Sequence, residues 1–448
     1  MPAIKWIATL SCPYPSAPPP LPLNWSSNDC CNWEGIACDP RGYVTHISLP
    51  SKGLTGNIFP FLGNFTHLSY LNLSHNLLSS TLPRGLFSSF NQLTVLDLSS
   101  NYLAGDFSFN SSANRTSEGL PTSIQVLDIS SNYFNGMIQS SFLERARNLT
   151  KLNLSNNNFT GSLPQSLMKC TNLVELILRK NLFEGNITSL NFSGLQQLTV
   201  LDMGINDFTD DSIAHSDGFK NVQLLSIDGC YLTGQLPTWL SNLKKLEILV
   251  LSNNSITGSI PNWFSTLPRL KHLDLGINHF SGEIPKELCS LPALISAQAL
   301  ESNTNSLILP IFADNNRAIE NQYNSLLFVF RGIWLNNNSL SGKISFEIGH
   351  LKLLHVLDLS DNNFSGNIPN QMSKLTNLQI LNFSTNQLSG EIPVSLANLN
   401  FLAEFSVANN NLSGPIPSGT QLQSFSPSAY EGMLDFVVPH FPRSAHIL

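Results

Sequence analysis

Charged residues are scarce in this chain: they make up 12% of its 448 residues, and the formal net charge is -7. Leu, Asn and Ser dominate instead, so the composition excludes a nucleic-acid binder and a disordered acidic tail. No apolar run approaches the roughly 18 residues that a membrane span requires, and Phe436-Val437-Val438 is far too short. The sequence therefore predicts no contact with nucleic acid and no membrane-spanning segment of its own.

Catalytic motifs are also missing. No glycine-rich phosphate loop precedes a lysine-bearing strand, and neither His-Arg-Asp nor Asp-Phe-Gly occurs, which excludes protein-kinase catalysis. His272 and Asp274 lie close in the sequence but have no third catalytic partner at a defined geometry. No second Cys or His pair stands at the spacing of zinc ligands. We therefore expect no enzyme, no cofactor and no metal site.

A phrase of 24 residues is repeated along the chain, and its clearest copy begins at Leu246 with the letters LEILVLSNNSITGSIP. The phrase matches LxxLxLxxNxLSGxIPxxLxxL, the plant-type leucine-rich repeat. No single coil of this kind can bury its apolar side, so the coils must stack. The predicted fold is an α/β solenoid, a superhelix with a concave parallel β-sheet. Copies begin at Val44, Leu68, Leu93, Ile124, Leu149, Leu173, Leu198, Val222, Leu246, Leu270, Phe330, Leu354, Leu378 and Leu402.

Within each phrase, apolar residues alternate with their neighbours as in a short strand with one buried face. In the clearest copy, Leu249 and Leu251 are expected to point inward, and Ile248 and Val250 outward. A regularly placed asparagine follows each strand, and its amide can donate to and accept from the turning backbone of neighbouring coils. We expect a ladder of such amides. Its members include Asn76, Asn101, Asn157, Asn254, Asn362 and Asn386.

Two steps of the repeat are irregular. The step from Leu93 to Ile124 is 31 residues long, and the step from Leu270 to Phe330 is 60 residues long. An insertion that interrupts a regular solenoid is either a neutral loop or a mark of function. The sequence is accordingly divided into an irregular Pro-rich leader (1–23), an N-terminal cap (24–43), repeat coils (44–293), an island insertion (294–329), further coils (330–425) and an irregular tail without a C-terminal cap (426–448).

Three of the seven cysteines, Cys30, Cys31 and Cys38, lie close together before the first coil. The first coil must hide its open apolar end, and a small disulfide-held cap would do so. Cys38 can pair with Cys30 or with Cys31, and the sequence leaves both open. Single cysteines inside coils are expected to be buried thiols.

Asn-x-Ser/Thr sequons are dense, which is typical of a secreted glycoprotein, although the repeat generates some of them from its own composition. A glycan at the inner-face sequons Asn72, Asn153 or Asn382 would block a ligand there. The expected glycosylation sites are Asn64, Asn110, Asn148, Asn186, Asn253, Asn363 and Asn411.

Both ends differ from those of a finished secreted protein. Residues 1–23 hold only a brief apolar stretch before Pro-rich sequence, which makes a poor signal peptide. Residues 434–448 hold no cysteine pair that could cap the last coil. We interpret the chain as a shortened product of a longer gene.

The motifs DCCNWEGIAC, LDLSSN, LSGEIP and FLAEFSVANNNLSGPIPSGTQLQSF resemble the ectodomain of plant leucine-rich-repeat receptor kinases. Within that family the chain is most similar to the phytosulfokine receptor and tyrosine-sulfated glycopeptide receptor branch. That branch carries an island of similar length and place, with elements similar to Leu309-Pro310-Ile311-Phe312 and Gln322-Tyr323-Asn324. Ala313-Asp314 and Val329-Phe330 depart from the phytosulfokine receptor pattern and favour the glycopeptide receptors.

The resemblance implies a tyrosine-sulfated peptide ligand that adds a strand to the island. The matching stretch runs from Ser296 to Asn303 and includes Gln298, Leu300 and Ser302. A sulfate needs donors or cations, and Arg317, Arg331 and His272, with Arg179 and Lys180 on nearby coils, are the candidates. Asp274 and Trp334 complete the expected ligand-binding residues on the concave face.

The resemblance also implies a co-receptor leucine-rich-repeat kinase that docks on the last coils, near Phe383, Phe405 and residues 421–425. It places the protein at the extracellular face of the plasma membrane, attached through a segment outside this chain. Two alternatives stay open: a kinase-less receptor-like protein in defence, and a secreted protein resembling polygalacturonase inhibitors.

Overall fold

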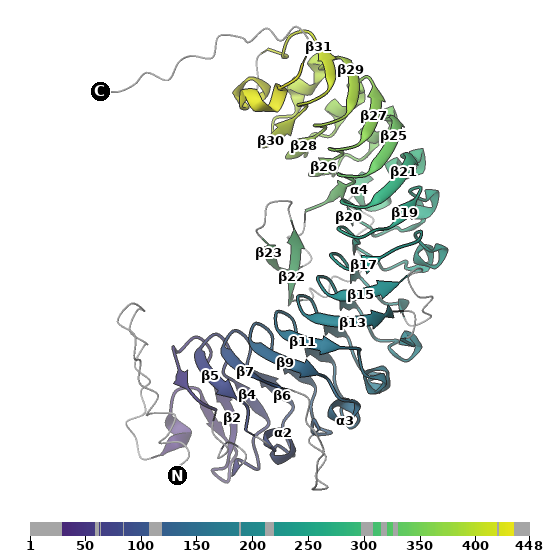
Figure 1. The fold of residues 1–448 in the computed structure, drawn as a ribbon. Coiled ribbons are helices and arrows are strands. Elements are labelled where there is room, and N and C mark those ends of the chain that lie inside the picture. Colours follow the sequence, from purple (N-terminus) through teal and green to yellow (C-terminus); the bar gives the residue numbers. More distant parts are fainter. Residues whose placement is uncertain are drawn as a thin grey trace, which may run out of the picture. The chain divides into compact units, whose positions relative to one another are not determined.

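The computed structural model describes residues 29–58, 62, 64–83, 85–106, 119–187, 190–210, 219–296, 308–314, 320–325, 330–418 and 421–433. The chain forms two compact units. Unit 1 comprises residues 1–210 and 214–222, and unit 2 comprises residues 211–213 and 223–448. Both units are built from the same coil, in which a sheet strand is followed by an outer strand and then by a short helix (Figure 1).

In unit 1 the sheet strands of successive coils lie side by side and pair in parallel, and one antiparallel strand precedes them. The sheet order is β1 (Ile36–Cys38), β2 (Val44–Ser48), β4 (Tyr70–Asn72), β6 (Val95–Asp97), β8 (Val126–Asp128), β10 (Lys151–Asn153), β12 (Glu175–Ile177) and β14 (Val200–Asp202).

The outer strands of unit 1 form a second parallel layer, and its short helices lie farther along each coil. The outer strands are β3 (Thr55–Gly56), β5 (Leu77–Thr81), β7 (Tyr102–Asp106), β9 (Tyr133–Met137), β11 (Asn158–Gly161), β13 (Leu182–Asn186) and β15 (Asp207–Asp210). The helices are η1 (Cys30–Asn32), α2 (Leu86–Ser89), α3 (Ser140–Leu143), η3 (Gln165–Lys169) and η5 (Phe192–Gly194).

Unit 2 repeats this arrangement. Its sheet strands, in order, are β16 (Leu224–Ser226), β18 (Ile248–Val250), β20 (His272–Asp274), β24 (Gly332–Trp334), β26 (Val356–Asp358), β28 (Ile380–Asn382) and β30 (Glu404–Ser406). Its outer strands are β17 (Tyr231–Leu232), β19 (Thr257–Gly258), β21 (His279–Glu283), β25 (Ser339–Lys343), β27 (Asn363–Gly366), β29 (Gln387–Glu391) and β31 (Asn411–Ser413).

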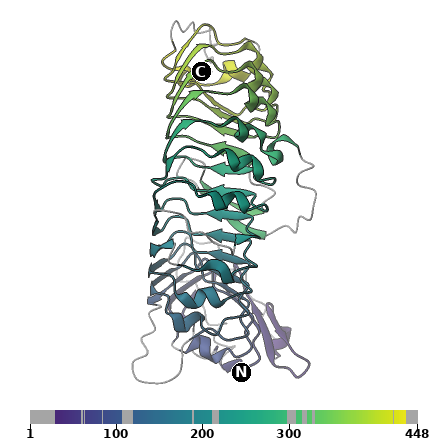
Figure 2. The ribbon, with the colours of Figure 1, turned by 90° about the vertical axis from the view of Figure 1, so that its right-hand side faces the viewer.

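Most helices of unit 2 are single 3-10 turns, and Figure 2 brings these short helices to the front. Several begin directly after the proline of the Ile-Pro pair, because a proline has no N–H to lose at a helix start; Pro261, for example, precedes η8. The helices are η7 (Thr238–Asn242), η8 (Asn262–Thr266), η9 (Lys286–Ser290), α4 (Pro292–Ile295), η12 (Phe346–His350), η13 (Asn370–Lys374), η14 (Val394–Asn398), η15 (Gln421–Ser424) and η16 (Pro427–Tyr430).

The predicted solenoid is confirmed, and a sheet strand lies at the start of every expected repeat. The asparagine ladder is present as well. Asn362 donates through Nδ2 to the carbonyl oxygens of Leu335, Leu359 and Ser360 at 2.9, 3.2 and 2.9 Å, and its Oδ1 accepts from Leu340 N at 3.0 Å. One amide thus satisfies backbone groups in its own coil and in the preceding coil, where no strand ladder reaches them.

The expected outward residues Ile248 and Val250 are instead buried, like the inward Leu249. Each sheet strand is only three residues long, and strands pair on both of its sides, with Ile248 between Leu224 and His272. Large neighbours along such a column shield one another from water. The prediction of a strand with only one buried face is therefore wrong for β18.

The N-terminal cap has the expected disulfide, and it joins Cys31 to Cys38 with an S–S distance of 2.00 Å. Cys30 is a free, half-buried thiol, so of the two pairings that the sequence left open, the structure has the one between Cys31 and Cys38. The Asp29 carboxylate accepts from Cys31 N at 3.0 Å and thereby holds the short helix η1 in place.

Candidate functional site: a groove over the sheet of unit 2

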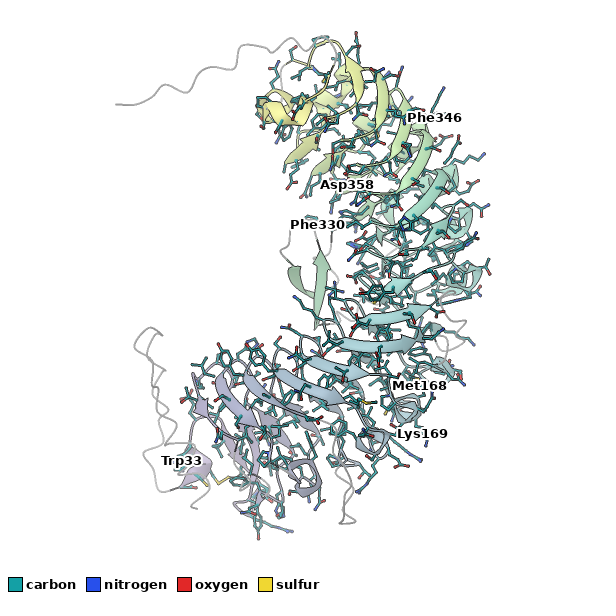
Figure 3. All side chains as sticks on the ribbon, viewed as in Figure 1. Trp33, Met168, Lys169, Phe330, Phe346 and Asp358 are labelled. Atoms are coloured by element: carbon teal, nitrogen blue, oxygen red, sulfur yellow. A yellow bond between two sulfur atoms is a disulfide. The ribbon has the colours of Figure 1, made fainter. Side chains whose placement is uncertain are left out.

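A groove with a volume of about 620 Å³ lies over four neighbouring sheet strands of unit 2, namely β24, β26, β28 and β30. Phe330 and Asp358 line the groove on one side of the ribbon of unit 2, and Phe346 lies on the opposite side of that ribbon (Figure 3). Its lining alternates aromatic, aliphatic, amide, hydroxyl and carboxylate groups. The lining residues include Phe330, Trp334, Asp358, Ser360, Asp361, Asn382, Glu404, Ser406, Phe425 and Ser428.

The parallel register of the strands sets these side chains in two columns. One column places Trp334, Asp358, Asn382 and Ser406 next to one another on successive strands. The other column places Gly332, Val356, Ile380 and Glu404 in the same order. The 24-residue period therefore forms a floor with one polar column and one mainly apolar column.

The groove is closed at one end by the segment after the last coil. Val407 N donates to Ala429 O at 2.8 Å and Asn409 N donates to Glu431 O at 2.6 Å. In earlier coils the equivalent bonds go to the next coil, as from Phe383 N to Ser406 O. The segment from Ser426 to Met433 thus takes the place of a further coil.

This packing differs from the irregular, uncapped tail expected from residue 426 onward. Tyr430 is buried and its hydroxyl donates to Leu422 O, and Phe405 packs on Phe425 with ring centroids 5.8 Å apart. No cysteine is needed, because backbone bonds and aromatic packing cover the last coil. Phe383 and Phe405 are also buried, so the prediction that they contact a co-receptor is wrong.

The charged residues that line the groove are acidic. Asp361 and Glu404 are exposed, while Asp358 is buried and accepts through Oδ1 from Ser360 N at 3.0 Å and Ser360 Oγ at 2.6 Å. Among the described lining residues there is no Lys, Arg or His. The floor of the groove is therefore complementary to a cation or to hydrogen-bond donors and not to an anion.

His272 cannot supply the cation that the sequence analysis assigned to it. It is buried, its Nδ1 lies 3.1 Å from Phe330 O, and its ring lies 4.4 Å from the ring of Trp334. Burial lowers the pKa of His272 to about 4, since the contact with Phe330 O offsets only part of this effect and the nearby Lys271 adds to it. The imidazole is neutral at neutral pH, so the hypothesis of a cationic His272 is wrong.

The Trp334 ring lies across the backbone of Gly332, where an added Cβ would come within 2.2 Å of the ring. Gly332 therefore makes room for the indole, which is itself buried. Trp334 lines the groove, and its ring contact with the buried His272 joins β20 to β24.

Asp274 and Arg179 are also occupied with structural contacts. Asp274 accepts from Ser252 Oγ at 2.9 Å and from Gly276 N at 3.0 Å. In unit 1, Arg179 is buried and its Nη1 lies 3.3 Å from Asp202 Oδ1. Arg331 is different: it is half-buried, it follows the groove residue Phe330, and burial lowers its pKa without removing its charge.

The chain leaves the regular coil after Ser296 and rejoins it at Phe330. Leu294 is buried and its carbonyl accepts from Leu353 N at 2.9 Å, while Ser296 is exposed and its N–H donates to Pro292 O at 3.1 Å. Within the insertion, β22 (Ile308–Asp314) and β23 (Glu320–Ser325) form an antiparallel pair. Gln298, Leu300, Ser302, Asn303 and Arg317 lie outside the described residues.

The expected glycosylation sites Asn64, Asn148, Asn186, Asn253, Asn363 and Asn411 are exposed, and Asn110 lies outside the described residues. The inner-face sequon at Asn153 is different, because this side chain is buried and its Nδ2 donates to Asp128 Oδ2 at 2.9 Å. A glycan cannot be attached there in the folded protein.

Sequence reasoning missed the groove residues Asp358, Asn382, Glu404 and Ser406 and the closing segment. The sequence does contain an indication of these residues, because the positions on either side of the central leucine of each sheet strand differ from one coil to the next. The sequence does not show in which coils these positions are exposed to solvent.

No helix among the described residues is both long enough and apolar enough to cross a membrane. Two families described as leucine rich repeat match residues 122–183 and 220–280, and residues 67–89, 353–375 and 377–399. The family described as leucine rich repeat N-terminal domain matches residues 7–39, and thus begins before residue 24, where the cap was expected to start.

Two curated proteins of Arabidopsis thaliana illustrate the similarity. The chain is 37% identical over 155 residues to receptor-like protein 3, with 33% of this chain and 20% of that protein covered. It is 33% identical over 178 residues to phytosulfokine receptor 1, with 33% of this chain and 17% of that protein covered. The matches thus span about a fifth of the length of these relatives.

A crystal structure of PEPR1-AtPEP1 has the same fold, with a TM-score of 0.64 and 28% sequence identity over 92% of this chain and 55% of that chain. The repeats, the N-terminal cap and these relatives all indicate the same kind of protein.

Proposed function

Since the chain is a plant leucine-rich-repeat receptor ectodomain, we propose that it binds a short extracellular peptide in the groove over β24, β26, β28 and β30. The observation that carries the proposal is the groove itself. It combines a continuous floor, an end closed by the segment around Ala429, and a lining of aromatic and hydrogen-bonding groups, the composition typical of ligand sites.

The dimensions of the groove suit an extended peptide of a few residues. Four strands at about 4.8 Å spacing span roughly 15 Å between the outer two, and an extended chain advances about 3.3 Å per residue, so about four or five residues cross the floor. Asn382, Ser406 and Ser428 can bond to the peptide backbone, while Phe330 and Phe425 can cover its side chains. The similarity to phytosulfokine receptor 1 supports a role for the groove in binding an extracellular ligand.

We further propose that the ligand carries a sulfated tyrosine and that the sulfate lies toward Arg331. Arg331 is half-buried and follows the lining residue Phe330 in the chain, without itself lining the groove, and a guanidinium suits a permanent anion. Asp361 and Glu404, farther along the floor, would repel a sulfate. The peptide would therefore lie with its anionic end toward Arg331 and with neutral or cationic groups over Asp361 and Glu404.

The remaining parts of the proposal rest on the relatives. We place the chain at the extracellular face of the plasma membrane, and we propose that a co-receptor leucine-rich-repeat kinase docks on exposed residues of the last coils and of η15, such as Gln421 and Ser424. A kinase-less receptor-like protein is the second candidate, favoured by the similarity to receptor-like protein 3. Both candidates use the same ligand groove.

Calorimetric titration tests the proposal. The secreted, glycosylated chain is titrated with pairs of short synthetic peptides that are identical in sequence and differ only in tyrosine sulfation. We expect tighter binding of the sulfated member, and we expect Arg331→Gln to remove the difference while the unsulfated peptide binds as before. Equal binding of both members would reject sulfate recognition, and no binding of any peptide would reject the peptide site.

A further inference from the structure

A row of exposed apolar side chains runs along the outer strands of unit 1. It is formed by the residue that follows the ladder asparagine in successive coils, and Tyr102 and Tyr133 at its centre are 50% and 54% exposed. Leu77 precedes this pair and Leu182 ends the row. Asn158 interrupts it, at the equivalent position between Tyr133 and Leu182.

Asn158 lies on β11, which pairs in parallel with β9, the strand of Tyr133, with Asn158 opposite Asn135. The rings of Tyr102 and Tyr133 lie stacked with centroids 6.2 Å apart. The next residues in the chain, Phe134 and Phe159, stack in the interior with centroids 6.4 Å apart. Tyr133 and Asn158 immediately precede these two phenylalanines, on the exposed face of the same strands, so they are separated by one coil step of similar length.

Asn158 is the acceptor position of a sequon, Asn158-Phe159-Thr160. Its side chain is exposed and Thr160 is half-buried. The neighbouring sequon in the same coil, at Asn153, is buried and its amide is hydrogen-bonded to Asp128. One coil thus holds an accessible glycan acceptor, Asn158, and an inaccessible one, Asn153. The second serves as an internal control for the first.

We propose that Asn158 carries an N-linked glycan and that its first sugar residues lie against the rings of Tyr133 and Tyr102. A pyranose ring has an apolar face of C–H groups that packs on an aromatic ring, whose π face carries partial negative charge. A glycan attached one coil away is held at high effective concentration over the pair. It would cover apolar surface that the described part of unit 1 otherwise exposes to water.

The attachment is a group transfer from a lipid-linked pyrophosphate oligosaccharide. The Asn158 amide nitrogen forms a bond to the sugar C1 and gives up one proton, while the C1–O bond to the pyrophosphate breaks and the lipid pyrophosphate leaves. This reaction requires that the chain enter the secretory route. The inference therefore rests on the extracellular location in the proposed function.

Glycopeptide mass spectrometry of the chain secreted from plant cells tests the attachment. We expect glycan at Asn158 and none at Asn153, and we expect Thr160→Ala to remove the first while Ser155→Ala changes no glycan. Glycan at other sequons with Asn158 bare would overturn this inference and leave the proposed function standing. A chain without glycan at any sequon would overturn both.

Tyrosine nitration tests the packing. Tetranitromethane is applied to the wild-type glycoprotein and to Asn158→Gln, which keeps every other glycan. We expect Tyr102 and Tyr133 to react several-fold faster in Asn158→Gln, while Tyr231, which is 61% exposed in unit 2, reacts equally in both. Equal rates at Tyr102 and Tyr133 in the two proteins would overturn the packing.

A matched variant separates packing from a general effect of glycan loss. Asn363 is the acceptor of another sequon at the same position of its coil, but its neighbours along the row are Ser339 and Gln387. Asn363→Gln should leave the nitration of Tyr102 and Tyr133 unchanged. A change as large as that in Asn158→Gln would contradict a local contact.

Discussion

His272 on β20 packs against Trp334 on β24 with ring centroids 4.4 Å apart, although the insertion separates the two in the sequence. The contact shows that the sheet of unit 2 continues across the insertion, with His272 paired to Gly332 and Asp274 paired to Trp334. The insertion therefore leaves the stack without breaking it, next to the groove that we propose as the peptide site.

The buried His272 should make the protein less stable toward unfolding as the pH falls. The unfolded chain takes up a proton at this side chain near its ordinary pKa of 6.5, whereas the folded chain does so only near a pKa of about 4. The stability contributed by the neutral imidazole is complete above pH 6.5 and is lost as the pH falls toward 4, by roughly 3 kcal/mol. Urea unfolding of the wild type and of His272→Phe between pH 4 and 7 measures the difference.

His272→Phe keeps an aromatic ring against Trp334 but has no titrating group, so its stability should fall less over that range. His279→Phe changes an exposed histidine of the neighbouring outer strand and should follow the wild type. Parallel curves for the wild type and His272→Phe would contradict a neutral, buried His272.

Glu175 in unit 1 should have the opposite pH dependence. Burial and then the nearby Asp128 raise its pKa, and the Lys151 ammonium 3.8 Å away offsets only part of this, so that the pKa is about 7. The folded state keeps the proton while the unfolded chain ionises, so stability is lost as the pH rises from 4.5 toward 7. Glu175→Gln should stabilise the protein at pH 7.5 by roughly 2 kcal/mol, and by little at pH 4.

Denaturant unfolding at the two pH values gives this difference directly. Glu184→Gln, on an exposed position of β13, serves as the control and should have no such effect. A destabilised Glu175→Gln at pH 7.5 would mean that the ion pair with Lys151 outweighs burial.

The ladder amide of Asn362 should be a large single contributor to unit 2. Asn362→Ala removes three donated bonds and leaves Leu340 N without its acceptor. Leaving such buried backbone groups unsatisfied costs roughly 3 kcal/mol in the free energy of unfolding. Thermal unfolding checks this, with the exposed Asn370→Ala as the control; a loss of similar size in both variants would contradict a structural ladder.

Much of the fold can be predicted from the sequence. The repeats must stack to bury their leucines, and the regularly placed asparagine is suited to hydrogen-bond the backbone of neighbouring coils. The positions of β18 and of the ladder Asn254 are where the phrase predicts them. Exposure could not be predicted in the same way. Ile248 and Val250 occupy positions that a single strand would leave open, and only the neighbouring coils bury them.

The candidate site was the least predictable part. The letters identified Arg179 and His272 as cations for a ligand, but Asp202 pairs with the first and burial neutralises the second. The closing segment at Ala429 and Tyr430 has no motif, because it covers the last coil through backbone hydrogen bonds and aromatic packing. Contacts between distant coils decide both outcomes.

The exposed carboxylates of the groove should favour a cationic residue in the ligand. Asp361 and Glu404 are exposed carboxylates of the lining, and a lysine in a bound peptide would gain about 1 kcal/mol from such a neighbour. Glu404→Gln should weaken a lysine-bearing peptide and leave its norleucine analogue unchanged in calorimetry. Glu391→Gln, on an outer strand away from the groove, is the control.

Photo-crosslinking shows directly whether a peptide binds in the groove over β24, β26, β28 and β30. A short sulfated peptide that binds the chain in calorimetry is remade with a photoreactive residue at each position in turn, and the crosslinked residues are identified by mass spectrometry. We expect crosslinks to groove residues such as Phe330, Asn382, Ser406 and Phe425, in one consistent order along the peptide. Crosslinks confined to unit 1, or to the short helices around Phe346, would contradict it.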